Sequence, residues 1–281
     1  MIVVETGTEV REWRRSAQGT VGFVPTMGAL HEGHRSLVRR AREECDRVVA
    51  SVFVNPKQFA PNEDLDRYPR PREADESILR EDGVDLAWFG RTDDFYPQGF
   101  ATEVAVPLLA RGLCGRTRPT HFAGVATVVL KLLHRVEPNR AYFGRKDFQQ
   151  FVLIRRMVED LDLDIEIVPC PIVRERDGLA MSSRNVHLSE RGRQRALALW
   201  RGLTAAKHRF DEEGDRDATS LVLTATREIL AETGVELEYV ELVDARSLVP
   251  VEVIEGDAVL AVAARVDGVR LIDNIAFGAD R

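Results

Sequence analysis

Cysteine is scarce in this chain of 281 residues, which has Cys45, Cys114 and Cys170 and no C-x-x-C pair. Three cysteines cannot all pair internally, so the sequence favours a reducing, cytoplasmic compartment over the disulfide-rich secreted class. Apolar runs are short, and none approaches the roughly 18 residues that a membrane helix needs. The first residues, MIVVETGTEVREWRRS, place acids within a short apolar stretch and show no cleavage pattern. We therefore expect no signal peptide and no membrane partner.

Basic residues are outnumbered, with 39 Lys and Arg against 46 Asp and Glu and a net charge of −7. This balance disfavours a dedicated nucleic-acid binder but leaves room for a local basic pocket that holds a phosphate-bearing ligand. Hydrophobic residues make up 44% and charged residues 30%, a composition that excludes disorder. The length predicts one large domain or two smaller ones.

The first two-thirds of the chain alternates short apolar runs with helical patterns. Strands are expected at 21–24, 47–54, 84–89, 141–143 and 165–168, and helices at 36–44, 71–81, 121–136 and around Phe151, Ile154, Val158 and Leu161. Strands that alternate with helices predict a parallel sheet with right-handed crossovers and helices on both faces. The fold class is therefore α/β, with a Rossmann-like sheet.

The pattern changes after about residue 172. Two helical stretches follow, at 189–212 and 217–233, and then strands at 237–243, 258–265 and 269–275. The last two strands are joined by Asp267-Gly268, a strong hairpin signal. We therefore predict a Rossmann-like domain at 1–172 and a smaller C-terminal α+β domain at 173–281. The loop at 173–185 has flexible ends and is placed to close over a site.

The segment VPTMGALHEGH, residues 24–34, leaves a predicted strand and enters a helix at about His34. A helix start offers free N–H groups and partial positive charge, which favour phosphate. His31 and His34 are three residues apart and so could face one ligand, while Gly33 allows a nucleotide close to the backbone. Alternatively, both histidines are ordinary surface residues. A zinc site is disfavoured because it needs H-E-x-x-H, and the two common glycine-rich nucleotide fingerprints are absent.

Polar side chains follow two other predicted strands. Asn55 and Gln58 come after the second strand, where amides can hold a small polar substrate, although Asn-Pro is also a turn signal. Lys146 and Asp147 are expected in the first turn of a later helix, with Gln150 on the same face. Asp147 there is explained by the helix dipole alone, whereas Lys146 is unfavourable unless a phosphate opposes it.

Two further segments give weaker signals. GLAMSSRN, residues 178–185, has two hydroxyls and a guanidinium that can donate to phosphate oxygens. RPTHF, residues 118–122, is consistent with a simple helix start capped by Thr120. Together with the earlier segments they describe a nucleotidyl-transfer site without a Walker motif.

The H-x-G-H string at the first helix of a parallel-sheet domain, with a later Ser-rich basic loop, resembles the nucleotidyltransferase superfamily that includes class I aminoacyl-tRNA synthetases. The fuller strings PTMGALHEGH, FVNPKQF, RPTHFAGV, FGRKDFQQ and DGLAMSSRN resemble, in that order, the pantothenate synthetase (pantoate–β-alanine ligase) family. The similarity is dense from about Val21 to Leu188 and continues more weakly to DNIAF, residues 273–277. The loop MSSRN lacks the lysines of the wider superfamily, which would leave part of the phosphate binding to Lys146.

This resemblance implies an ATP-dependent ligase that joins (R)-pantoate to β-alanine through a pantoyl-adenylate and releases AMP and pyrophosphate. The implied ATP contacts are Met27, Gly28, Ala29, Leu30, His31, Glu32, Gly33, His34, Gly144, Arg145, Lys146, Asp147, Val173, Met181, Ser182, Ser183 and Arg184. The implied catalytic residues are His34 (a proton donor in the family), His31, Lys146, Ser182, Ser183 and Arg184.

The resemblance also implies the substrate and metal contacts. Gln58 and Gln150, with Asn55, would hold pantoate, and Gln58 would also meet β-alanine. Asp75 would lie near a Mg²⁺ ion held mainly by the phosphates and water. A homodimer is a further expectation from the family.

Three other functions fit parts of the pattern. A tRNA synthetase is disfavoured because about 110 residues remain for an anticodon-reading domain in an acidic chain. A nucleotidyltransferase that keeps AMP on its product is a nearer rival. A non-catalytic ATP-binding module is disfavoured because every expected polar residue is present.

Overall fold

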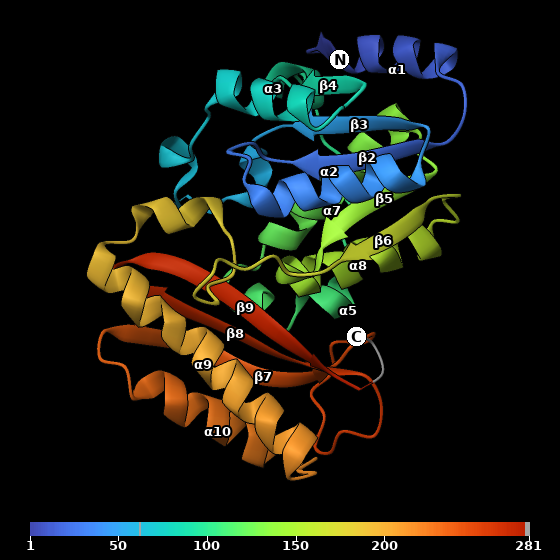
Figure 1. Cartoon of the computed structure of the whole chain (residues 1–281). Helices are drawn as coiled ribbons and strands as arrows, with labels where there is room; N and C mark the ends of the chain where they lie inside the picture. Colours follow the sequence, from blue (N-terminus) through green and yellow to red (C-terminus); the bar gives the residue numbers. More distant parts are fainter. Residues whose placement is uncertain (62, 279–281) are drawn as a thin grey trace.

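The computed structural model describes residues 1–61 and 63–278, and its first part is a six-stranded parallel sheet (Figure 1). The strands are β1 (Ile2–Val4), β2 (Val21–Thr26), β3 (Arg47–Val52), β4 (Leu86–Phe89), β5 (Arg140–Gly144) and β6 (Glu166–Cys170). Their order is β1-β4-β3-β2-β5-β6, and every pair is parallel. The predicted Rossmann-like sheet is confirmed.

Helices cover both faces of this sheet. The longer ones are α1 (Gly7–Ser16), α2 (Glu32–Glu44), α3 (Arg72–Glu81), α7 (His121–Val136) and α8 (Phe148–Asp160). Apolar side chains of α2 and α3 pack on one face, and those of α1, α7 and α8 pack on the other. Short elements connect them: α4 (Thr92–Phe95), α5 (Pro107–Ala110), α6 (Cys114–Thr117), η1 (Pro56–Gln58), η2 (Leu65–Arg67), η3 (Arg145–Asp147) and η4 (Ser183–His187).

The order of strands places a topological switch between β2 and β5. After β2 the chain adds β3 and β4 on one side, and then returns to place β5 and β6 on the other. In open parallel sheets, ligands bind outside the carboxyl ends of the strands at such a point. Here those ends are Thr26 of β2 and Gly144 of β5.

A smaller antiparallel sheet follows, as predicted. Its elements are α9 (Glu190–Glu212), α10 (Ala218–Leu230), β7 (Val235–Asp244), β8 (Ala258–Val266) and β9 (Val269–Phe277), with strand order β7-β8-β9. The helices α9 and α10 cover its outer face (Figure 1). The other face, with Tyr239 and Val259, joins the apolar core of α7 and α8. Asp267 and Gly268 both have positive φ (51° and 76°), as the predicted hairpin turn requires.

Several local predictions were wrong. The strand β1, the helix α1 and the short helices between residues 92 and 117 were not predicted. Helix α2 begins at Glu32, before the predicted start at about His34, because His31 caps it. Thr120 precedes α7 but makes no capping hydrogen bond, since its backbone is already helical (φ −95°, ψ −11°). The loop predicted at 173–185 contains a hairpin, in which Met181 N–H donates to the Val173 carbonyl, and the start of η4, while its closure over a site stays a prediction.

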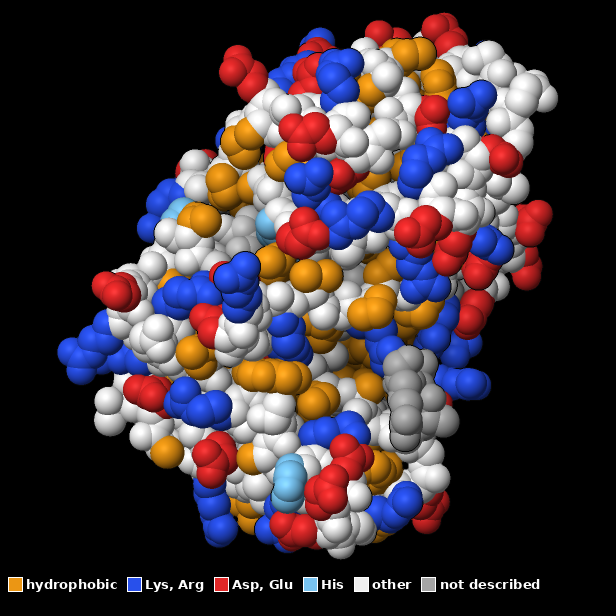
Figure 2. Space-filling model, in the orientation of Figure 1, with side chains coloured by type: hydrophobic (Ala, Val, Ile, Leu, Met, Phe, Trp, Pro, Cys, Tyr) orange, Lys and Arg blue, Asp and Glu red, His pale blue; other side chains and the backbone are white. Residues whose placement is uncertain are grey.

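Two further features concern the distribution of surface charge and the character of the helices. Figure 2 shows acidic and basic side chains interspersed over one face of the molecule. Across the described part of the chain, no helix combines the length and the apolar character that crossing a membrane requires.

Candidate active site

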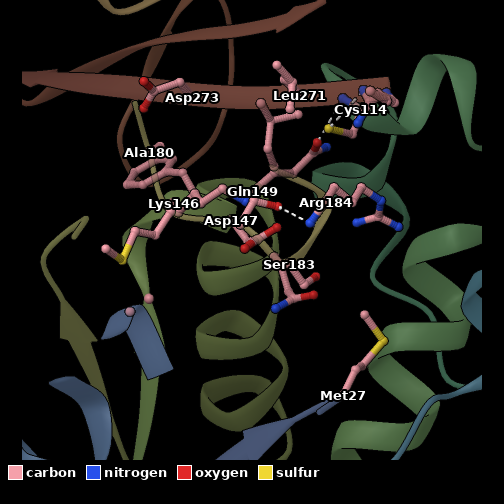
Figure 3. Close-up of a pocket in the computed structure, with 18 of the residues that line it drawn as sticks. Met27, Cys114, Lys146, Asp147, Gln149, Ala180, Ser183, Arg184, Leu271 and Asp273 are labelled. Carbon is pink, nitrogen blue, oxygen red and sulfur yellow. Dashed lines mark hydrogen bonds between the residues drawn. The ribbon is translucent and has the colours of Figure 1, made fainter. Parts of the chain in front are cut away.

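A cavity of about 710 Å³ lies at the carboxyl ends of β2 and β5, with β9 of the second sheet on its other side (Figure 3). In this view, Lys146, Asp147 and Ser183 lie between Asp273 of β9 and Met27. The predicted site residues that line the cavity are Met27, His31, Gly33, His34, Asn55, Gln58, Gly144, Lys146, Asp147, Gln150, Val173, Met181, Ser182, Ser183 and Arg184. Gly28, Ala29, Leu30, Glu32, Asp75 and Arg145 lie in adjoining segments outside its lining.

His31 and His34 form the N-terminal cap of α2. Nδ1 of His31 accepts the Gly33 N–H at 3.1 Å, and Nδ1 of His34 accepts the His31 N–H at 3.3 Å. This is the geometry of a capping box, with imidazoles in place of the usual hydroxyl and carboxylate. Gly33 leaves room for this ring position, because a Cβ there would lie 2.8 Å from Cε1 of His31.

These caps define the protonation of both rings. Because each Nδ1 accepts a hydrogen bond, each neutral ring carries its proton on Nε2. Burial, with the charge of Lys146, lowers the pKa of His31 to about 4. Burial, followed by His31 and Lys146, lowers the pKa of His34 to about 3. At neutral pH both rings are therefore uncharged hydrogen-bond donors through Nε2.

Asp75 shapes the loop between β2 and α2. Its carboxylate, 1% exposed, accepts hydrogen bonds from Ala29 N–H at 2.9 Å and Leu30 N–H at 2.8 Å. The loop needs this support because Gly28 and Ala29 both have positive φ (83° and 50°), which is costly for alanine. Burial raises the pKa of Asp75 above its ordinary value. Over residues 1–61 and 63–278, no three His, Cys, Asp or Glu side chains are grouped to hold a metal ion.

Lys146 and Asp147 lie in η3, which joins β5 to α8, and so precede the helix in whose first turn they were predicted. Lys146 is half-buried and lines the cavity. Its charge contributes to the lowered pKa of both cap histidines. Gln150 lines the same cavity from the first turn of α8.

The Ser-Ser-Arg segment is tied to the loop after η1. The Ser182 hydroxyl accepts Arg184 N–H at 3.2 Å and so caps η4. Arg184 donates to both carboxylate oxygens of Asp64 at 2.9 and 3.2 Å. The Tyr68 and Ser183 hydroxyls lie 3.4 Å apart. These contacts place Arg184 and Ser183 at the wall of the cavity.

Asn55 lines the cavity, but both polar atoms of its side chain are hydrogen-bonded within the protein, in part to Gln58. Its Nδ2 donates to Oε1 of Gln58 and to the Gly124 carbonyl, both at 3.1 Å. Its Oδ1 accepts from the Tyr96 hydroxyl at 2.7 Å, and the side chain is 1% exposed. Gln58 in turn places Nε2 3.0 Å from Sδ of Met27. Asn55 therefore orients the amide of Gln58.

Sequence reasoning missed the residues that fix the backbone of Gln58. Its carbonyl lies 2.8 Å from Nδ1 of His121 and accepts a hydrogen bond from Arg118 at 3.2 Å. Burial, with the nearby Arg118 charge, lowers the pKa of His121 to about 4. Gly124 lets α7 approach this turn, because a Cβ there would collide with the Lys57 carbonyl. Arg118, His121 and Gly124 all lie in the segment RPTHFAGV. When that segment is interpreted only as the start of a helix, it does not indicate these contacts.

The switch point of the parallel sheet thus brings an H-x-G-H helix cap, a lysine and a Ser-Ser-Arg turn to one cavity, the set of groups expected of an ATP-dependent ligase. The sequence profile described as pantoate-beta-alanine ligase matches residues 2–276. The chain belongs to the pantoate–β-alanine ligase family.

Similar proteins agree over nearly the whole chain. A pantothenate synthetase of Thermotoga petrophila is 50% identical, over 99% of this chain and 100% of its own length. The crystal structure of pantothenate synthetase from Thermus thermophilus is 46% identical, with a TM-score of 0.93 over 98% of this chain and 99% of that one. A Francisella tularensis pantoate-beta-alanine ligase, complexed with beta-gamma ATP and beta-alanine, is 35% identical, with a TM-score of 0.80 over 98% and 97%.

Proposed function

We propose that this chain condenses (R)-pantoate with β-alanine in an ATP-dependent reaction that passes through pantoyl-adenylate and releases AMP and pyrophosphate. The observation that carries the proposal is the shared cavity at the switch point. The cavity is lined by groups from three segments that are able to donate hydrogen bonds to phosphate, and also by the amides of Gln58 and Gln150, which suit a small hydroxy acid. Membership of the pantoate–β-alanine ligase family supports the same reaction.

In the first step the pantoate carboxylate attacks the α-phosphorus of ATP, and the bond to the pyrophosphate oxygen breaks. The carboxylate is ionised at pH 7, so the step needs no strong base. It needs in-line positioning and neutralisation of the charge on the phosphate oxygens. Lys146 and Arg184 supply positive charge, and Ser182 and Ser183 supply hydroxyl donors.

His31 and His34 act in this step as neutral donors through Nε2–H. The family assigns a proton-donor role to the residue at the position of His34. Burial lowers the pKa of His34 to about 3, so its ring is neutral at neutral pH and carries its proton on Nε2. Pyrophosphate leaves as an anion and needs hydrogen bonds more than a proton, so a donor imidazole fits the chemistry.

Gln58 and Gln150 bind pantoate, and Gln58 also meets β-alanine, while Asn55 orients Gln58. Neutral amides match hydroxyls that both donate and accept, and they leave the carboxylate free to attack. In the second step the β-alanine amine attacks the acyl carbon and AMP leaves. The adenylate is labile, so the site must exclude water. Residues 1–172 would bind ATP and pantoate, and the domain at 173–281 would close over them.

Mg²⁺ would be held mainly by the phosphates of ATP and by water, with Asp75 as the acid near the ion. The Asp75 carboxylate accepts the Ala29 and Leu30 N–H groups and so holds the loop that leads into α2. The protein works in the cytoplasm as a homodimer, with small molecules as its only other partners.

Product analysis with ATP, Mg²⁺, pantoate and β-alanine tests the proposal. We expect pantothenate, AMP and pyrophosphate in equal amounts. AMP retained on the product would instead indicate a nucleotidyltransferase. Binding of all substrates without turnover would indicate a non-catalytic module. Either result would overturn the proposal.

A further inference from the structure

Two adjacent side chains of β9 hold the η3 turn and the hairpin that leads into Ser182–Arg184. Asn274 is 6% exposed, and its Nδ2 donates to the carbonyls of Arg145 at 2.9 Å and Lys146 at 3.0 Å. Both carbonyls belong to η3, the turn that carries Lys146. One amide from the C-terminal sheet thus bridges two consecutive peptide groups of the turn.

The neighbouring Asp273 holds the second segment. Its carboxylate, 4% exposed, accepts two hydrogen bonds from Arg174, at 2.6 and 2.9 Å. Arg174 also donates to the Gly178 carbonyl at 3.1 Å and lies 3.6 Å from the ring centroid of Trp200. Arg174 is therefore fixed from three sides, and it anchors the hairpin that leads into Ser182–Arg184.

The pair is itself rigid. The Asn274 N–H donates to Oδ1 of Asp273 at 2.7 Å, and the Asn274 carbonyl accepts from Arg174 at 3.4 Å. Buried polar groups that are fully hydrogen-bonded have few alternative arrangements. Movement of one segment relative to β9 would leave buried donors or acceptors unpaired, at a substantial cost in free energy.

We propose that Asp273 and Asn274 are positioning residues that fix the η3 turn of Lys146 relative to the Ser182–Arg184 segment. This inference rests on the proposed function, because it matters for catalysis only if both segments hold the same phosphates. Misplacement of a charged group by about 1 Å is enough to reduce a rate about 100-fold. The strand β9 thereby gives the C-terminal sheet a direct role in arranging the catalytic groups.

The main test compares Asn274→Ala with Phe277→Leu, a control on the same strand. Phe277 is fully buried against the α9–α10 core and does not line the cavity. We expect Asn274→Ala to lower kcat about 10- to 100-fold with the KM for pantoate nearly unchanged. The control should lose thermal stability but keep its kcat when measured well below its melting temperature. Equal kcat in the two variants would overturn the proposal.

A double variant tests whether Asn274 acts through Lys146. Adding Asn274→Ala to Lys146→Ala should cost little further rate, because the group being positioned is already gone. If each substitution instead lowered kcat by its full factor in the presence of the other, Asn274 would not act through Lys146. If Asn274→Ala does not fold, Asn274→Ser replaces it under the same criteria.

Hydrogen–deuterium exchange of residues 144–150 gives a readout independent of turnover. This segment should exchange faster in the Asn274 variant than in wild type or the Phe277 control, and unchanged exchange would overturn the positioning role. Failure of wild-type protein to form pantothenate would instead contradict the proposed function, and the exchange result would still decide whether Asn274 holds the turn.

Discussion

The rings of His31 and His34 lie with their centroids 4.1 Å apart at the first turn of α2, and Nδ1 of each accepts a backbone N–H of that turn. The two nitrogens of each ring therefore have different roles. Nδ1 satisfies the helix end, and Nε2–H remains to donate to a ligand. A substitution that keeps the helix cap but removes the Nε2–H donor can measure the two roles separately.

The variants His31→Asn and His31→Ala make that separation. Asparagine is a good N-cap, so His31→Asn should keep the stability of wild type, whereas His31→Ala should lose about 1 kcal/mol. Both remove the Nε2–H donor and should lower kcat by a similar factor. Urea denaturation and steady-state kinetics measure the two effects. Wild-type kcat in His31→Asn would show that the ring only caps the helix.

Lys146→Ala and His34→Ala should chiefly lower kcat. Each removes a group that meets charge as it builds on the phosphates, and loss of one such contact costs about 10²–10³-fold, or roughly 3–4 kcal/mol. Circular dichroism and melting should stay near wild type for Lys146→Ala. Near-full turnover in either variant would remove that residue from the mechanism.

Gln58→Ala and Gln150→Ala should weaken pantoate binding by about 1–3 kcal/mol, because partner groups lose their hydrogen bonds. ATP binding should change little. Calorimetry of each variant with each substrate makes the comparison. An equal loss for ATP, or an unchanged affinity for pantoate, would place these glutamines outside the pantoate site.

The sequence predicted elements whose signals are local. The stripe from Phe122 to Val136 predicted α7 at its observed bounds, because every turn of that helix buries an apolar residue. Asp267-Gly268 predicted the hairpin because positive φ at both positions requires such residues. By contrast, β1 has three residues and is held by pairing with β4, more than 80 residues away.

The sequence predicted which segments line one cavity where a motif directly follows a strand end. The prediction was incomplete where one residue supports another across the fold. Asn55 was predicted as a substrate contact because the sequence does not reveal that its side-chain amide is hydrogen-bonded to Gln58 and Tyr96. Asn274 lies 128 residues from the Lys146 carbonyl that it holds. Only the packing of β9 against η3 makes that contact visible.

The free energy of unfolding should fall as the pH is lowered, because three buried histidines resist protonation in the folded protein. The pKa of His31, His34 and His121 is lowered to about 4, 3 and 4, mainly by burial, whereas in the unfolded chain it is near 6.5. Below about pH 6.5 the unfolded chain therefore binds protons that the folded chain does not. Their stabilisation is complete above that pH and is lost toward pH 4, by up to about 1.4 kcal/mol per pH unit for each histidine.

Urea denaturation of wild type and His121→Gln between pH 7.5 and 4.5 measures this effect. The variant should show a shallower decline, because glutamine does not titrate, while the carboxylates contribute equally to both proteins. Identical slopes would contradict the lowered pKa of His121.

The most direct test of the adenylate mechanism is ATP–pyrophosphate exchange in the presence of pantoate and Mg²⁺ and without β-alanine. If the pantoate carboxylate attacks the α-phosphorus in this cavity, labelled pyrophosphate will be incorporated into ATP only when pantoate is present. Formation of ADP and phosphate, or exchange that does not depend on pantoate, would contradict the account.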